Sequence, residues 1–283
     1  MKKLLFATDF SENAEKAFGY ALKLVRMHGA DLIMLHVFGV PTAWDYPHTE
    51  DALEMEREAF EMSKKQMKAL FDRYVKEADN LNVSFVAAEN NAVGKGIVAA
   101  IKELNPDLVV VGTKGASKAR EIIVGSTAKS LIRLSPCPVL SVPENTDLIN
   151  VKKILYATDF LEDDIPAIRQ LMALVQPFDP EIILAHVSTH TSYHSDERMQ
   201  WFMELVNEKI IGNRIKFDLL LSDDILDSLN LYIKQNDIDL LAMVEKERSG
   251  VADRLFHNDH VKQMEFHTSV PLLSFNEHFL RVF

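Results

Sequence analysis

The chain has 283 residues, a formal net charge of −11, a hydrophobic content of 47% and a single cysteine. The excess of acidic over basic residues argues against nucleic acid or an anionic membrane surface as the main partner. The sequence contains no apolar run of about 18 residues, the length that a membrane-spanning helix requires. One cysteine excludes an intramolecular disulfide and favours a reducing compartment, so we expect a cytoplasmic protein.

In the first half, short apolar runs alternate with amphipathic segments. Apolar runs predict strands at residues 3–7, 31–36, 83–88, 108–111 and 139–142. Helical periodicity and capping residues predict a helix that starts near Ser11 and stops at Gly29, followed by helices at about 49–78, 96–104 and 126–134. Strands that alternate with helices predict an α/β fold with a parallel sheet covered on both faces.

A glycine pattern follows the fourth predicted strand. Gly112 is followed by Gly115, and nine residues then separate Gly115 from Gly125. Ser126 and Thr127 come next, where a helix is expected to start. Glycines allow an anion to approach backbone N–H groups, and a helix start attracts negative charge, so the pattern predicts a phosphate cradle. It is not a Walker A loop, because no lysine precedes Ser126. A plain turn followed by a helix cap is the alternative interpretation.

The chain also repeats itself. The segment 2–10 recurs at 152–160, the segment 35–37 at 185–187, and the segment 137–141 at 270–274. Self-similarity over half the length predicts two copies of one domain, at residues 1–145 and 150–283, joined by the polar stretch 143–147.

In a sheet of this kind, ligands bind outside the carboxyl ends of the strands, where the strand order reverses. Asp9 follows the first strand, Val37 lies at the end of the second, and Gly112 ends the fourth. We therefore expect these three residues to line one crevice. Asp9 can accept hydrogen bonds from a ribose or a base, and Val37 can offer its backbone to an adenine edge.

These segments resemble those of a tandem universal stress protein. The matching residues are the Ala-Thr-Asp-Phe-Ser run at 7–11, His36 with Val37, the glycine pattern, and the closing segment 133–140. The resemblance covers nearly all of both halves. It implies two five-stranded parallel-sheet sandwiches of the Rossmann-like, adenine nucleotide alpha hydrolase type, packed as an internal pseudo-dimer.

The resemblance further implies that the glycine pattern holds the phosphates of ATP, with Mg²⁺ as its companion ion. Carried over by position, adenosine contacts fall on Ala7, Asp9 and Val37. Contacts with the phosphates or the adjoining backbone fall on Val111, Gly112, Gly115, Gly125, Ser126 and Thr127.

The second half departs from this pattern. Aligned backwards from its last strand, Asn258 and Asp259 stand where Gly125 and Ser126 stand in the first half, and Val244, Glu245 or Arg248 fall near the two earlier glycines. An acidic residue at a helix start caps the N–H groups itself, and carboxylates repel a triphosphate. We therefore expect no ATP in the second half, whose role is to pack against the first.

Other residues carry weaker patterns. His186, His190 and His194 have a spacing compatible with a metal site, but their surroundings indicate a solvated loop, as they do for His257 and His260. Cys137 lies between two prolines beside a strand, which favours a buried thiol over a nucleophile. We therefore assign no catalytic and no metal-ligating residue.

Two functional classes follow from these observations. The leading one is a regulatory, ATP-binding module of a stress response, with no turnover or only slow hydrolysis, an unknown regulatory protein partner, and a homodimer as a candidate assembly. The alternative is an interaction or scaffold protein of the stress response whose glycines serve the fold alone.

Overall fold

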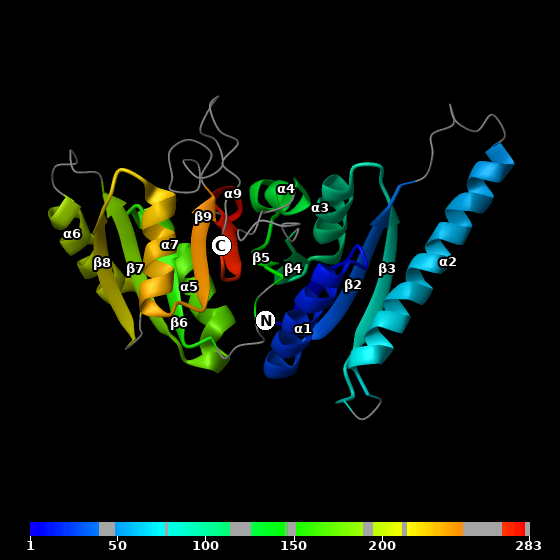
Figure 1. The fold of residues 1–283 in the computed structure, drawn as a ribbon, viewed down its shortest axis with the longest axis horizontal. Helices are drawn as coiled ribbons and strands as arrows, with labels where there is room; N and C mark the ends of the chain where they lie inside the picture. The colour runs from blue at the N-terminus through cyan, green and yellow to red at the C-terminus, as the bar shows by residue number, and fades with distance from the viewer. Residues whose placement is uncertain are drawn as a thin grey trace. The chain divides into compact units, whose positions relative to one another are not determined.

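The structure, a computed structural model, describes residues 1–39, 49–76, 79–113, 126–144, 146, 151–188, 195–210, 214–245 and 268–280. Within these ranges the chain divides into two compact units (Figure 1). The first unit comprises residues 1–113 and 126–144, and the second comprises the described residues from 146 onward.

The first unit is built on five parallel strands in the order β3-β2-β1-β4-β5. Their bounds are β1 (Lys3–Ala7), β2 (Asp31–Phe38), β3 (Val83–Glu89), β4 (Leu108–Gly112) and β5 (Val139–Val142). The chain runs outward from β1 to β3 and resumes on the other side of β1 with β4. The strand order therefore reverses between β1 and β4, where ligands bind in folds of this class.

Four helices cover this sheet. Their bounds are α1 (Glu12–His28), α2 (Thr49–Tyr74), α3 (Val93–Leu104) and α4 (Ser126–Leu134). Right-handed crossovers place α1 and α2 on one face and α3 and α4 on the other. On the first face, Glu15 of α1 accepts hydrogen bonds from Arg73 (2.6 Å) and Tyr74 (3.1 Å) of α2. On the other face, α3 packs against α4 (Figure 1).

The ends of α1 confirm the predicted capping residues. The Ser11 hydroxyl accepts a hydrogen bond from the Ala14 N–H at 3.2 Å, and acidic residues occupy the first turn. Gly29 has a φ of 61° and donates its N–H to the Val25 carbonyl. A side-chain acceptor at the start and a left-handed glycine at the end satisfy backbone groups that the helix leaves unpaired.

Two helix boundaries differ from the predicted ones. α2 ends at Tyr74 and not near residue 78, because Asp79 accepts the Lys76 N–H, donates its own N–H back to the Lys76 carbonyl, and pairs with Arg26 at 2.8 Å. α3 starts at Val93, three residues earlier than predicted, after the Asn90 side chain accepts the Ala92 N–H.

The second unit has the same design. Its parallel strands follow the order β10-β9-β6-β7-β8. The bounds are β6 (Lys153–Ala157), β7 (Glu181–Ser188), β8 (Ile215–Leu221), β9 (Leu240–Glu245) and β10 (Leu272–Asn276). The helices are α5 (Ile165–Val175), α6 (Ser195–Lys209), α7 (Ile225–Asn236) and α9 (Glu277–Leu280), with 3-10 turns η2 (Glu162–Asp164) and η3 (Gln176–Phe178) on either side of α5. The predicted α/β fold class, with five parallel strands in each unit, is confirmed.

The sequence repeat extends to individual hydrogen bonds. In the first unit, the Asp107 carboxylate accepts the backbone N–H groups of Lys2 and Lys3, just before and at the start of β1. In the second unit, Asp239 accepts those of Lys152 and Lys153 in the same way. Each carboxylate lies just before the neighbouring strand, so it fixes the start of β1 or β6 against β4 or β9.

Each unit buries its own apolar core. Phe6 and Phe18 are fully buried in the first unit, and Tyr156, Phe160 and Phe202 in the second.

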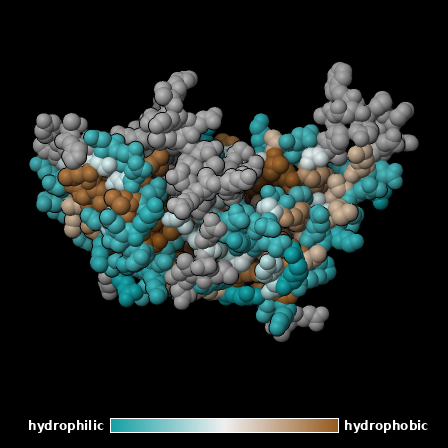
Figure 2. All heavy atoms as spheres, in the orientation of Figure 1, coloured by the Kyte–Doolittle hydropathy of each residue, from teal (hydrophilic) through white to brown (hydrophobic). Residues whose placement is uncertain are grey.

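Over the region where Figure 1 places β8 and α7, Figure 2 shows apolar side chains on the surface. Among the described residues, none of the helices combines the length and the apolar character that a membrane crossing requires.

Candidate functional site

The structure brings predicted site residues of three strands to one edge of the first sheet. Ala7 ends β1 and lies opposite Val111 of β4, while Val37 lies on β2, the neighbour on the other side. Only 7%, 6% and 4% of Ala7, Val37 and Val111 are exposed. Their side chains therefore belong to the core, and only their backbone groups are available to a ligand.

The remaining predicted residues divide into two groups. Gly112 ends β4, and Ser126 and Thr127 start α4, whose first N–H groups carry a partial positive charge. Gly115 and Gly125 lie outside the described residues.

Asp9 is presented by a strained turn of residues 8–10, hereafter the Thr8–Phe10 turn. Phe10 has a φ of 61°, a left-handed conformation that costs a residue with a Cβ about 1–2 kcal/mol. The Phe10 N–H donates to Thr8 Oγ1 at 3.0 Å and closes the turn. Such strain persists where surrounding contacts impose it, and it gathers at functional sites.

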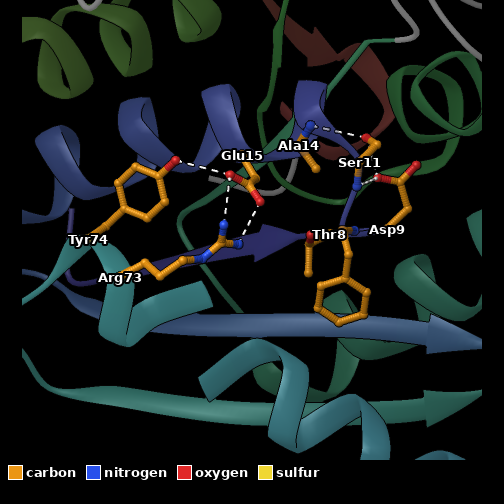
Figure 3. Close-up of polar contacts among 8 residues, drawn as sticks. Thr8, Asp9, Ser11, Ala14, Glu15, Arg73 and Tyr74 are labelled. Carbon is orange, nitrogen blue, oxygen red and sulfur yellow. Dashed lines mark hydrogen bonds and ion pairs between the residues drawn. The ribbon is translucent and has the colours of Figure 1, made fainter. Parts of the chain in front are cut away.

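The exposed Asp9 carboxylate is held at one of its two oxygens. Oδ1 accepts hydrogen bonds from the Ser11 N–H at 3.0 Å and the Ser11 hydroxyl at 2.6 Å, and Ser11 caps α1 (Figure 3). Within the described residues, the hydrogen bonds of Asp9 involve Oδ1 alone, and Figure 3 shows the second oxygen directed away from Ser11. An oriented carboxylate with an open oxygen is suited to accept hydrogen bonds from ligand hydroxyl groups.

His36 of β2 holds the turn from the other side. Its Nδ1 lies 2.8 Å from the Thr8 carbonyl oxygen, and because a carbonyl only accepts, Nδ1 is the donor. The imidazole also contacts the Phe10 ring, with 4.5 Å between ring centroids and a tilt of 41°. The sequence analysis noted His36 as part of the repeat and of the family resemblance, and it missed this role.

Two glycines shape the site because neighbouring groups lie where their side chains would be. A Cβ on Gly112 would lie 3.1 Å from the carbonyl oxygen of Asn13 in α1. A Cβ on Gly96 would lie 2.7 Å from a methyl group of Val37 and 2.8 Å from Cβ of Asn90. The absence of a side chain at Gly112 thus serves the packing of α1 whether or not a ligand is bound. Sequence reasoning did not identify the role of Gly96.

A buried polar atom lies on the same turn of α1. In the described part of the chain, Oδ1 of Asn13 is shielded from solvent and has no hydrogen-bond partner. Buried polar atoms are satisfied in most proteins by protein, water or ligand groups. The turn of α1 that contacts Gly112 therefore offers a polar group of its own beside the end of β4.

The second unit carries larger side chains at the equivalent positions. Ala157 of β6 lies opposite Met243 of β9, just as Ala7 lies opposite Val111. The register therefore places Val244 where Gly112 stands and Glu245 where Thr113 stands. Val244 and Glu245 are buried, with exposures of 4% and 6%. Arg248, Asn258 and Asp259 lie outside the described residues.

A buried carboxylate also occupies the second unit near the end of β6. Thr158 donates its hydroxyl to Asp164 of η2 at 2.6 Å, and Asp164 is only 1% exposed. Burial raises the pKa of the neighbouring Tyr156 well above its ordinary value, and the charge of Asp164 raises this pKa further. In the first unit, the equivalent of Tyr156 is the apolar Phe6, so this polar cluster is specific to the second unit.

The other candidates from the sequence show structural roles where they are described. Nδ1 of His186 donates to the Thr158 carbonyl at 2.8 Å, and His190, His194, His257 and His260 lie outside the described residues. Across the described ranges, no three His, Cys, Asp or Glu residues are grouped to hold a metal ion. Burial raises the pKa of the Cys137 thiol to about 12, which keeps it protonated and unreactive at neutral pH.

Comparison with known sequences gives matches to the universal stress protein family. A model of the universal stress protein family matches residues 1–143. A universal stress protein of Thermus aquaticus is 33% identical over 142 residues, which are 50% of this chain and 98% of the relative. A Staphylococcus aureus protein with the same family name is 31% identical over 144 residues, which are 50% of this chain and 83% of the relative.

Solved structures extend the likeness to both units. A universal stress protein from Archaeoglobus fulgidus has a TM-score of 0.71 at 17% identity, covering 97% of this chain and 98% of its own. A Pseudomonas aeruginosa protein with the same family name has a TM-score of 0.63 at 13% identity, covering 99% of this chain and 95% of its own. At such identities the likeness concerns the fold alone.

Proposed function

Since the chain belongs to the universal stress protein family, we propose that its amino-terminal half binds ATP or a related adenine nucleotide as a regulatory ligand. The observation that carries this proposal is the oriented Asp9 carboxylate beside the switch point between β1 and β4. In this proposal, Asp9 accepts hydrogen bonds from the ribose hydroxyl groups. The backbone groups of Ala7 and Val37 contact the adenosine.

The phosphate end of the nucleotide requires main-chain N–H groups and positive charge. Val111 and Gly112 end β4 beside α1, and α4 starts with Ser126 and Thr127. We assign the phosphates to these segments together with Gly115 and Gly125, because a helix start and glycine backbone favour an anion. Mg²⁺ would neutralise phosphate charge when the nucleotide binds.

The second half is expected to bind no ATP. A valine stands in the place of Gly112, and the buried Glu245 carboxylate follows it. A negative charge in this position disfavours a triphosphate, because like charges repel most strongly where water is excluded. The proposed stoichiometry is therefore one nucleotide per chain, and the second half would pack against the first as a built-in partner.

We assign the nucleotide a regulatory role because, among the site residues that the structure describes, none is an evident general base or arginine finger for phosphoryl transfer. A protein partner of the stress response would then recognise whether the nucleotide is bound. We place this interaction in the cytoplasm, because the single cysteine favours a reducing compartment. Assembly of two chains into a homodimer is compatible with this role.

Isothermal titration calorimetry with ATP and Mg²⁺ tests the proposal. We expect one mole of ATP per chain, and Gly115→Val and Gly125→Val should abolish binding while circular dichroism shows an intact fold. Asn258→Val, at the equivalent place in the second half, is the matched control and should leave binding unchanged. Two moles per chain would overturn the assignment of a degenerate second half, and no binding would favour the scaffold alternative.

A further inference from the structure

The Thr8–Phe10 turn has a counterpart in the second unit with the same contacts. Phe160 has a φ of 55°, and its N–H donates to Thr158 Oγ1 at 2.8 Å. His186 donates to the Thr158 carbonyl at 2.8 Å and contacts the Phe160 ring, with centroids 5.2 Å apart and a tilt of 41°. In each unit, one histidine and one phenylalanine with a left-handed backbone conformation thus hold the chain after β1 or β6.

The surroundings of the two turns differ in a way that bears on function. Phe160 is fully buried and packs on Phe202 of α6, with 5.4 Å between ring centroids. The Thr158 hydroxyl is also tied to Asp164. Phe10 is only half-buried, and within the described residues the contacts that hold its turn include those with Thr8, Ser11 and His36. The first turn therefore depends more on its histidine than the second turn does.

We propose that His36 is a positioning residue of the nucleotide site, which fixes the Thr8–Phe10 turn so that Asp9 points at the ligand. This inference rests on the function proposed above. His36 does not touch the nucleotide in this scheme. It acts through the hydrogen bond to the Thr8 carbonyl and through the Phe10 ring, while Ser11 holds Asp9 from the helix side. Pre-orientation of this kind raises affinity because the ligand does not have to order the turn.

The central experiment measures ATP affinity by calorimetry in His36→Leu, which removes the Nδ1 donor and replaces the imidazole with an apolar side chain. We expect an affinity loss of up to about tenfold, the upper range of what one hydrogen bond to a backbone carbonyl contributes. His36→Asn should recover most of the affinity, because the asparagine amide offers a donor near the position of Nδ1. His186→Leu removes the same bond from the second unit and should leave ATP affinity unchanged.

A double-mutant cycle separates positioning from general stability. If His36 acts through Asp9, His36→Leu should weaken ATP binding in the wild-type background but not in the Asp9→Ala background. Urea unfolding should show comparable stability losses for His36→Leu and His186→Leu, so a stability effect alone cannot produce the difference in affinity. Thr8→Val, which removes the acceptor of the Phe10 N–H, provides a second route if His36→Leu fails to fold. It should also weaken ATP binding only when Asp9 is present.

The outcomes distinguish this inference from the proposed function. If wild-type protein binds ATP and His36→Leu binds it equally well, the positioning role is wrong while the proposed function stands. If His36→Leu lowers ATP affinity equally in the wild-type and Asp9→Ala backgrounds, the positioning role is also wrong. If wild-type protein binds no adenine nucleotide, the proposed function fails and this inference fails with it.

Discussion

Gly112 and Asn13 lie in backbone contact, although one residue ends β4 and the other lies in the first turn of α1. A Cβ built on Gly112 would be 3.1 Å from both the carbonyl carbon and the carbonyl oxygen of Asn13 and 3.2 Å from the Ala14 nitrogen. This contact sets the approach of α1 to the sheet at the switch point. It also means that the glycine at this position has a structural cause beyond any ligand.

Replacement of this glycine tests the contact directly. Gly112→Ala should lower the free energy of unfolding by about 1–3 kcal/mol, because backbone atoms of α1 would have to move to accept the new methyl group. Urea unfolding followed by circular dichroism measures the change. ATP affinity should also fall, because Asp9 and the cap of α1 share Ser11. An unchanged unfolding midpoint would show that α1 tolerates a side chain here.

Gly96→Ala should change the stability of the protein in the direction opposite to that usual for such a substitution in a helix. An alanine in a helix interior usually stabilises by about 0.5–1 kcal/mol relative to glycine. Here the methyl group would meet Val37 and Asn90 at 2.7 and 2.8 Å, so we expect destabilisation of about 1–3 kcal/mol.

The double variant Gly96→Ala with Val37→Ala is the control for this clash. It should be more stable than the sum of the two single changes predicts, since the valine methyl groups are gone. Strict additivity in urea unfolding would argue that Val37 and residue 96 do not compete for space.

The buried carboxylate of the second unit gives a third prediction. Thr158→Val removes the hydroxyl that donates to Asp164 at 2.6 Å, and it should cost about 1–3 kcal/mol because the buried acceptor loses a donor. The same substitution at Thr8 is the matched comparison, because the hydrogen bond of the Thr8 hydroxyl described above is with a backbone N–H. Equal losses in urea unfolding for the two variants would contradict the importance of the Thr158–Asp164 bond.

Alkaline pH should weaken the fold through Tyr232. Burial raises the pKa of Tyr232, and the hydrogen bond from its hydroxyl to Asp218 at 2.8 Å raises it further. Because the folded pKa exceeds the unfolded value of about 10, its contribution is complete below pH 10 and is lost as pH rises toward the folded pKa.

Unfolding in urea at several pH values, for wild type and Tyr232→Phe, measures this contribution. The stability of wild type should fall more steeply above pH 10 than that of Tyr232→Phe, which lacks the ionisable hydroxyl. Parallel curves would show that Tyr232 ionises alike in the folded and unfolded chains.

Much of the fold was predictable because its causes are local. The apolar runs gave the strands of the first unit to within two residues, and Ser11 and Gly29 marked the ends of α1. The boundaries at Tyr74 and Val93 were missed, because Asp79 and Asn90 redirect the chain through side-chain hydrogen bonds. Helix propensity does not depend on such bonds, so it cannot predict where they end or start a helix.

The site was predictable in part. Asp9, Val37 and Gly112 were expected at one sheet edge, and they lie at or just after the carboxyl ends of the neighbouring parallel strands β1, β2 and β4. That they line one ligand crevice stays a prediction. The role of His36 was not predicted, because its bond to Thr8 spans 28 residues and depends on how β2 lies beside β1.

The sequence by itself determined the alternation of strands and helices, the doubling of the domain, and the family, because backbone periodicity, capping and repeated segments are written in neighbouring residues. Only the tertiary structure decided which glycines make room for a helix or a valine, which histidine holds the turn of Asp9, and which side chains fill the equivalent place in the second unit. These features depend on distances between residues far apart in the chain, and strand register and helix packing set those distances.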